Sequence, residues 1–122
     1  MSDFIEIKDK RGVKIFCSKS QWENHIVSES GHPIMRDNIY AVEETLRAPD
    51  IIYESHDSDP PGDYREVFSK EVESATYHSK QPYTKVVVSV VGGSGEVITA
   101  YPAKNPRGGT QGEAIYRAGN EN

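Results

Sequence analysis

The sequence contains a single cysteine, Cys17, among its 122 residues. One thiol excludes an internal disulfide, and with it a fold that depends on one. Histidines are also few, and they are scattered along the chain as His25, His32, His56 and His78. Because zinc and similar metals need clustered ligands, we expect neither a metal centre nor another cofactor.

Long apolar runs are missing as well. Hydrophobic residues make up 35% of the chain. No stretch approaches the roughly 20 apolar residues with which a helix crosses a bilayer. Residues 1–4 lack the basic and apolar regions of a secretory signal peptide. We therefore expect a cytoplasmic protein that makes no contact with membranes.

The chain has fewer basic residues than acidic residues, 14 against 19. The formal net charge is −5, which disfavours tight, non-specific binding of nucleic acid. The excess of acidic residues lies in residues 1–79, which contain 16 of the 19 Asp and Glu but only 9 of the 14 Lys and Arg. A site for a polyanion would therefore be a local pocket and not a broad basic surface.

The strongest structural signal in the chain is at residues 84–102. Two runs rich in β-branched residues, 86–91 and 97–101, favour strands because branched side chains fit a pleated surface. Residues 92–95 separate them as Gly-Gly-Ser-Gly and supply the positive φ angles of a tight reversal. This pattern predicts a β-hairpin and not a phosphate-binding loop, which would lead from a strand into a helix.

The register of this hairpin decides which side chains share a face. A three-residue loop at residues 93–95 would pair Val91 with Val97, and this register separates apolar from polar positions better than its neighbours do. We then expect one apolar face, packed beneath the helix that carries Trp22 and formed by Val86, Val88, Val90, Ile98 and Ala100. The opposite face would carry Lys85, Ser89, Thr99 and Tyr101.

Two helices are expected before the hairpin. Ser20 and Glu23 form a capping box for a helix that would run to about residue 28. Trp22 and Ile26 lie one turn apart and give this helix an apolar stripe. Apolar residues at helical spacing predict a second helix over residues 37–47.

Further strands and an acidic loop lie around these helices. Alternating residues predict an N-terminal hairpin over residues 3–17, and short β-rich runs predict strands at 51–53 and 64–72. The loop between the last two resembles a calcium loop, but prolines interrupt it and Phe68 stands where a bidentate glutamate should be. We expect its carboxylates to be solvated and to bind no calcium tightly: Asp57, Asp59 and Asp63.

Together these elements predict an α+β fold. Two N-terminal helices would pack on the apolar face of an antiparallel sheet of about four strands, with the N-terminal hairpin as an addition. Residues 103–122 are rich in glycine and polar residues, which predicts a disordered, flexible tail. We therefore expect a single domain over residues 1–102.

An ordered set of short segments resembles a known group of proteins. The segments are W-E-N-H-I at 22–26, H-P at 32–33, E-E-T-L-R-A-P-D-I-I at 43–52, V-V-V-S-V at 86–90 and V-I-T-A-Y-P at 97–102. In this order they resemble the phage-associated nuclease-like domains of the barnase, EndoU, colicin and RelE-like group, which share the BECR fold. The resemblance spans roughly residues 14–102 and implies helices followed by an antiparallel sheet.

The resemblance implies a metal-independent RNA endonuclease, toxin-like or phage-borne. Such enzymes use the RNA 2′-hydroxyl to attack the adjacent phosphorus. His25 would be the general acid–base, because histidine titrates near neutral pH. The remaining catalytic positions would be Thr99 and Tyr101 with a cation from Arg65 or Lys70, and Lys85 and Ser89 would contact the substrate. The implied partners are RNA and a cognate immunity or antitoxin protein.

Two other functions agree with the same residues. A non-catalytic binding module of the same fold, such as an immunity or antitoxin-like protein or a phage accessory factor, is consistent with the net charge of −5, which suits a basic partner. A purely structural domain would leave His25 at the edge of a helix, and Thr99 and Tyr101 on the solvent side of a sheet. Convergence of these residues in one pocket would favour the nuclease.

Overall fold

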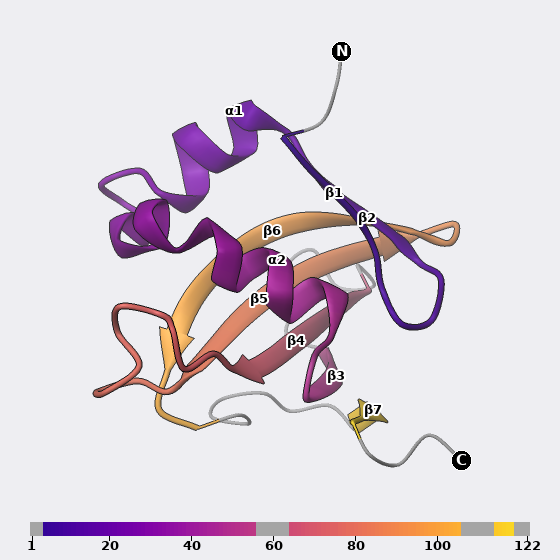
Figure 1. Ribbon diagram of the computed structural model, residues 1–122. Helices are drawn as coiled ribbons and strands as arrows, with labels where there is room; N and C mark the ends of the chain where they lie inside the picture. Colours follow the sequence, from indigo (N-terminus) through magenta and orange to yellow (C-terminus); the bar gives the residue numbers. More distant parts are fainter. Residues whose placement is uncertain (1–3, 56–63, 106–113, 119–122) are drawn as a thin grey trace.

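A computed structural model describes residues 4–55, 64–105 and 114–118, and its centre is one seven-stranded sheet (Figure 1). The strands lie side by side in the order β1-β2-β6-β5-β4-β3-β7. Neighbouring strands are antiparallel except β2 and β6, which are parallel. The bounds are β1 Ile5–Lys8, β2 Lys14–Cys17, β3 Ile51–Ser55, β4 Arg65–Glu71, β5 Tyr83–Val91, β6 Ser94–Ala103 and β7 Ala114–Arg117.

Helical segments occupy the chain between β2 and β3. A single turn α1, Lys19–Gln21, continues into a π-helical turn η1, Trp22–Ile26, and a 3₁₀ helix η2, Pro33–Asn38, leads into α2, Ile39–Arg47. Figure 1 shows α2 lying across one face of the sheet, in front of β6, β5 and β4. Among the described residues no helix has the length and hydropathy needed to cross a bilayer.

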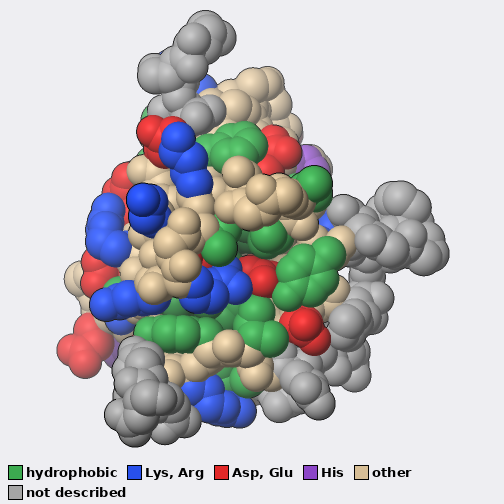
Figure 2. All heavy atoms as spheres, turned by 90° about the vertical axis from the view of Figure 1, so that its right-hand side faces the viewer, with side chains coloured by type: hydrophobic (Ala, Val, Ile, Leu, Met, Phe, Trp, Pro, Cys, Tyr) green, Lys and Arg blue, Asp and Glu red, His purple; other side chains and the backbone are tan. Residues whose placement is uncertain are grey.

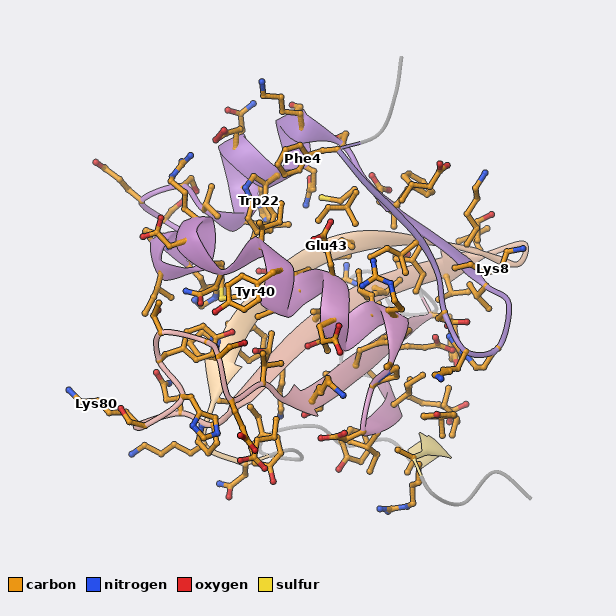
Figure 3. All side chains as sticks on the ribbon, in the orientation of Figure 1. Phe4, Lys8, Trp22, Tyr40, Glu43 and Lys80 are labelled. Atoms are coloured by element: carbon orange, nitrogen blue, oxygen red, sulfur yellow. The ribbon has the colours of Figure 1, made fainter. Side chains whose placement is uncertain are left out.

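The hydrophobic core lies between α2 and this face of the sheet. Ala41, Val42 and Leu46 recur at helical spacing, and all three are fully buried. They join a cluster with the buried Val86 and Val88 of β5. Phe4 and Trp22 extend it toward α1, with ring centroids 5.8 Å apart (Figure 3). One helix stripe and one sheet face therefore form the core.

The predicted fold class is wrong in its sheet and in its tail. Seven strands replace the expected four, and the N-terminal hairpin belongs to the sheet because β2 pairs with the start of β6. Gly95 has no side chain at this junction, where a Cβ would lie 2.6 Å from Cγ1 of Val88. Residues 114–117, expected within a disordered tail, form β7 and pair with β3. A four-residue strand is too short to show periodicity, and its pairing is set by tertiary contact.

The hairpin register also differs from the predicted one. Gly92 and Gly93, with φ of 61° and 83°, form a two-residue turn that pairs Val91 with Ser94. A bulge then follows, so that Val97 and not Ile98 faces the core. Val86, Val88 and Ala100 are buried as expected, Val90 is only partly buried, and the helix that covers them is α2.

The first predicted helix begins and ends about two residues earlier than expected. Ser18, not Ser20, caps it, because its Oγ accepts a hydrogen bond from the backbone nitrogen of Gln21 at 3.0 Å. The helix ends in the π-helical turn, where the nitrogen of Val27 donates to the oxygen of Trp22. The chain then reverses at Gly31, where a Cβ would overlap the carbonyl oxygen of His25.

Candidate functional site

The sheet face opposite α2 carries most of the predicted site residues. Successive side chains of a strand point to opposite faces, so the register places a second set of residues on this side. Lys85 lies opposite Tyr101 of β6 and Ser69 of β4, and Val87 lies opposite Thr99. We name this surface the polar face, and its site residues are Arg65, Ser69, Lys85, Ser89, Glu96, Thr99 and Tyr101.

Lys85 lies at the centre of the polar face and is almost completely buried, with 1% of its surface exposed. Burial lowers the pKa of its ammonium group below that of an exposed lysine, because a charge is poorly solvated there. Burial raises the pKa of the neighbouring Tyr101 phenol for the same reason. At neutral pH the phenol therefore keeps its proton and can donate it in a hydrogen bond.

Ser69 adds a buried hydroxyl beside Lys85. The residue has no exposed surface, and its Oγ makes no hydrogen bond within the described part of the chain. An unpaired buried hydroxyl costs about 1–3 kcal/mol relative to a paired one. The polar face thus contains a polar atom that no described residue satisfies.

His32 is the histidine that the structure brings to this face. Its ring lies against the ring of Tyr101, with centroids 5.3 Å apart and planes inclined by 35°. Backbone hydrogen bonds fix the loop around His32. The backbone nitrogen of His32 donates to the oxygen of Ile26, and the backbone oxygen of His32 accepts from the nitrogen of Met35. Sequence reasoning did not select His32, although the H-P pair was visible, because its contact with β6 joins segments far apart in the chain.

The path of the chain explains how His32 arrives there. β2 pairs only with residues 94–96 of β6, so the rest of β6 is an edge of the sheet within the described residues. Gln21 closes part of this edge by donating from Nε2 to the carbonyl oxygen of Ile98 at 2.8 Å. The loop that follows η1 then carries His32 past the edge to Tyr101.

Two predicted catalytic residues lie elsewhere. Lys70 is on the α2 side of β4, opposite Thr84, where its Nζ donates to the oxygen of Ala48 and lies 3.8 Å from Oδ1 of Asp50. His25 is exposed on η1, and the described contacts do not join it to Thr99 or Tyr101. The structure therefore gathers Thr99, Tyr101, Arg65, Lys85 and Ser89 on one face, without Lys70.

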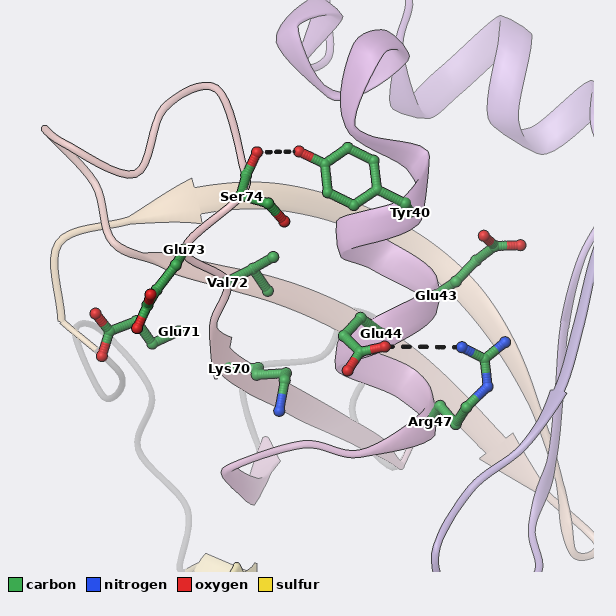
Figure 4. Close-up of a pocket in the computed structure, with 9 residues that line it drawn as sticks. All are labelled: Tyr40, Glu43, Glu44, Arg47, Lys70, Glu71, Val72, Glu73 and Ser74. Atoms are coloured by element: carbon green, nitrogen blue, oxygen red, sulfur yellow. Dashed lines mark hydrogen bonds and ion pairs between the residues drawn. The ribbon is translucent and has the colours of Figure 1, made fainter.

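A larger cleft lies on the α2 side, away from the polar face (Figure 4). Its volume is about 410 Å³, and it separates α2 from the segment that follows β4. Tyr40 closes one end by donating from its hydroxyl to the oxygen of Ser74. The charged lining residues are Glu43, Glu44, Arg47, Lys70, Glu71 and Glu73. This cleft is predominantly acidic, and no predicted site residue other than Lys70 lines it.

A buried ion cluster also lies on the α2 side. Arg11 donates to both carboxylate oxygens of Glu66, at 2.7 and 3.0 Å, and to Oδ2 of Asp9. Tyr64 donates to the same Glu66 at 2.9 Å. Burial alone would lower the pKa of Arg11, and its hydrogen bonds with the two carboxylates more than offset this. All groups in the buried ion cluster are paired, so the cluster holds the hairpin to the sheet.

Figure 2 views the molecule from the side of the β1–β2 hairpin, where basic and acidic side chains are intermingled.

Neither metal ligation among the described residues nor similarity to known proteins gives a further indication of function. Among the described residues no three His, Cys, Asp or Glu side chains form a group that could hold a metal ion. The acidic loop with Asp57, Asp59 and Asp63 lies outside the described residues. Comparison with protein families, curated protein sequences and solved structures gives no match. The resemblance to BECR nucleases therefore stays a prediction.

Proposed function

We propose that this protein is a metal-independent RNA endonuclease whose site is the polar face. The observation that supports this most directly is the contact of His32 with Tyr101, which lies opposite Lys85. An imidazole, a protonated phenol and a buried lysine side chain are thereby close together. This set can move a proton, donate hydrogen bonds and stabilise negative charge.

The proposed reaction is a transesterification within the RNA strand. The 2′-hydroxyl loses its proton to a base and attacks the adjacent phosphorus, and the bond to the 5′-oxygen of the next nucleotide breaks. That oxygen takes up a proton, and a 2′,3′-cyclic phosphate remains. His32 is the group we assign to proton transfer, since it is only partly buried and its ring lies against that of Tyr101.

Tyr101, Thr99 and Lys85 stabilise the transition state in this proposal. The hydroxyls of Tyr101 and Thr99 donate to the phosphate oxygens as charge develops on them. Lys85 is buried beside Tyr101 on the same face and acts through its charge, which a low-dielectric surrounding strengthens. A phosphate at the face would raise the pKa of Lys85 again, because an opposite charge favours the ammonium form. Arg65, further along the same face, offers a second cation.

The test compares the two histidines in one assay. The substrate is a single-stranded RNA oligonucleotide in EDTA, with the matching DNA, which lacks the 2′-hydroxyl, as a substrate control. His32→Ala should lower the cleavage rate by about 10²–10⁴-fold, which is the usual value of general acid–base catalysis. His25→Ala, exposed and seven positions earlier, serves as the matched control and should retain the wild-type rate. Cleavage of DNA, or full activity of His32→Ala, would contradict the proposal.

The alternative is a non-catalytic binding module, and the acidic cleft beside α2 favours it. Four glutamates and Tyr40 line that cleft, and carboxylates with an aromatic ring suit a basic partner. If the wild-type protein leaves RNA intact, the binding module becomes the better proposal. For the nuclease, the proposed partners are RNA and a cognate immunity protein, and the proposed location is the cytoplasm, where RNA is accessible.

A further inference from the structure

The β6 strand carries a backbone irregularity next to the proposed site. A bulge at Ile98 interrupts the ladder between β5 and β6, directly before Thr99. On the other side of β6, the described part of β2 pairs only as far as Glu96. The carbonyl group of Ile98 therefore needs a partner from outside the sheet, because a backbone acceptor without one costs free energy.

Gln21, the last residue of α1, supplies this partner. Its Nε2 donates to the carbonyl oxygen of Ile98 at 2.8 Å. That carbonyl and the N–H of Thr99 belong to one planar peptide group, so the hydrogen bond also fixes the orientation of the Thr99 backbone. Gln21 is partly buried, and a hydrogen bond shielded from water is stronger than one at the surface.

Gln21 also begins the segment that leads to His32. It stands directly before η1, whose Trp22 and Ile26 are buried. The backbone nitrogen of His32 donates to the oxygen of Ile26 at 2.7 Å, which ties the loop to the end of η1. The ring of His32 then reaches Tyr101, further along β6. One side-chain hydrogen bond and one ring contact thus join the same two parts of the chain, residues 21–32 and β6.

We propose that Gln21 is a positioning residue of the RNA-cleaving site, which holds His32 against Tyr101 through its hydrogen bond with β6. This inference rests on the proposed function, since it assigns Gln21 a part in the same reaction. Gln21 itself touches neither the substrate nor the reacting atoms and acts through the two segments that it joins. Because a displacement of about 1 Å can cost about 10²-fold in rate, loss of this one hydrogen bond should affect the reaction.

The test removes the donor without changing the size of the side chain. Gln21→Glu puts a carboxylate oxygen against the carbonyl oxygen of Ile98, and two acceptors repel each other. Asn24→Asp is the matched control, because Asn24 is exposed on η1 and its Nδ2 donates to Oγ of Ser20 at 3.2 Å and not to the sheet. Both variants gain one negative charge, so their comparison removes any general effect of charge.

The first measurement needs no catalysis. It follows the nuclear Overhauser effect between the ring protons of His32 and Tyr101 by NMR in the protein without RNA. The wild type and Asn24→Asp should show this signal, and a folded Gln21→Glu variant should lose most of it. Gln21→Ala, which removes the donor without adding a repulsion, gives the same comparison if Gln21→Glu does not fold. A full signal in the folded variant would overturn the inference, because the buried part of η1 would then hold the loop by itself.

Cleavage rates then assign the role in the reaction. Per folded molecule, Gln21→Glu should lower kcat by about 10- to 100-fold with KM nearly unchanged, whereas a merely structural role would lower the Tm and leave kcat as it is. When His32→Ala is already present, the same substitution should cost little more, because Gln21 acts through His32. Losses that multiply as for two independent residues would contradict the inference.

The two measurements distinguish failure of this inference from failure of the proposed function. A wild-type protein that cuts no RNA overturns the nuclease, and loss of the NMR signal in Gln21→Glu would still support Gln21 as the residue that positions His32. Cleavage of RNA at the wild-type rate by Gln21→Glu leaves the nuclease in place and overturns the inference. Loss of both the signal and the rate in Gln21→Glu, with neither lost in Asn24→Asp, supports both.

Discussion

Removal of Arg11 should destabilise this protein more than removal of any surface arginine. The guanidinium bridges two carboxylates whose side chains are 0% and 4% exposed, those of Asp9 and Glu66. It also lies over the ring of Phe68, with 5.5 Å from its central carbon to the ring centroid. In Arg11→Ala both carboxylates would stay in their low-dielectric positions without a cation.

The magnitude follows from this burial. Removing one partner of a buried ion pair typically costs about 3–5 kcal/mol, because the remaining charge is poorly solvated. Arg11 itself is 25% exposed, so water partly reaches the site and the lower end of that range applies. A loss of about 3 kcal/mol corresponds to a fall in Tm on the order of 10–20 °C for a domain of this size. Since natural domains are stable by only about 5–15 kcal/mol, the variant would approach the limit of folding.

The assay is thermal and urea unfolding followed by circular dichroism, with Arg36→Ala as the matched control. Arg36 forms an ion pair with Glu23 at 2.9 Å, but the side chains are 54% and 38% exposed. Such surface pairs contribute about 0–1 kcal/mol, so this control should lose no more than a few degrees. Equal losses in the two variants would refute the conclusion that the buried cluster holds the N-terminal hairpin to the sheet.

Two further predictions concern stability. Ser69→Ala should leave the free energy of unfolding unchanged or raise it by about 1–3 kcal/mol, because the hydroxyl removed is buried and has no partner among the described residues. A clear loss of stability in urea unfolding would show that the hydroxyl is paired. Burial raises the pKa of Tyr77 and Tyr101 above the unfolded value of 10.0. The two phenols therefore contribute fully to the free energy of unfolding below pH 10, and this contribution is lost as the pH rises beyond it. The urea midpoint should fall between pH 10 and 11, and it should fall less in Tyr77→Phe.

The polar face was largely predictable because alternation along a strand depends only on neighbouring residues. Thr99 and Tyr101 share a face whatever strand lies beside them, and so do Lys85 and Ser89. The register between the two strands was not predictable in the same way. Gly92 and Gly93 allowed a shorter turn than expected, and a bulge at Ile98 added a residue to one strand.

Contacts between distant segments account for the remaining differences. Lys70 was a candidate cation, but its face depends on how β4 pairs with β5, and that pairing puts it beneath α2. His32 and His25 were equivalent candidates by residue type, and only the loop path past the edge of β6 selects His32. The pairing of β7 with β3 likewise depends on tertiary contact alone.

The face of the sheet under α2 contributes to stability, whereas the polar face carries the proposed chemistry. Strand β5 contributes side chains to both faces. Val86 and Val88 of this strand are packed in the core, whereas Lys85 and Ser89 alternate with them on the polar face. A variant that only weakens the α2 side, such as Arg11→Ala, should lower the stability and leave the cleavage rate per folded molecule unchanged. A variant that shifts β5 itself should change both, because a strand cannot move one set of its side chains without the other. Comparing rates per folded molecule in the two kinds of variant therefore tests whether the polar face is the site.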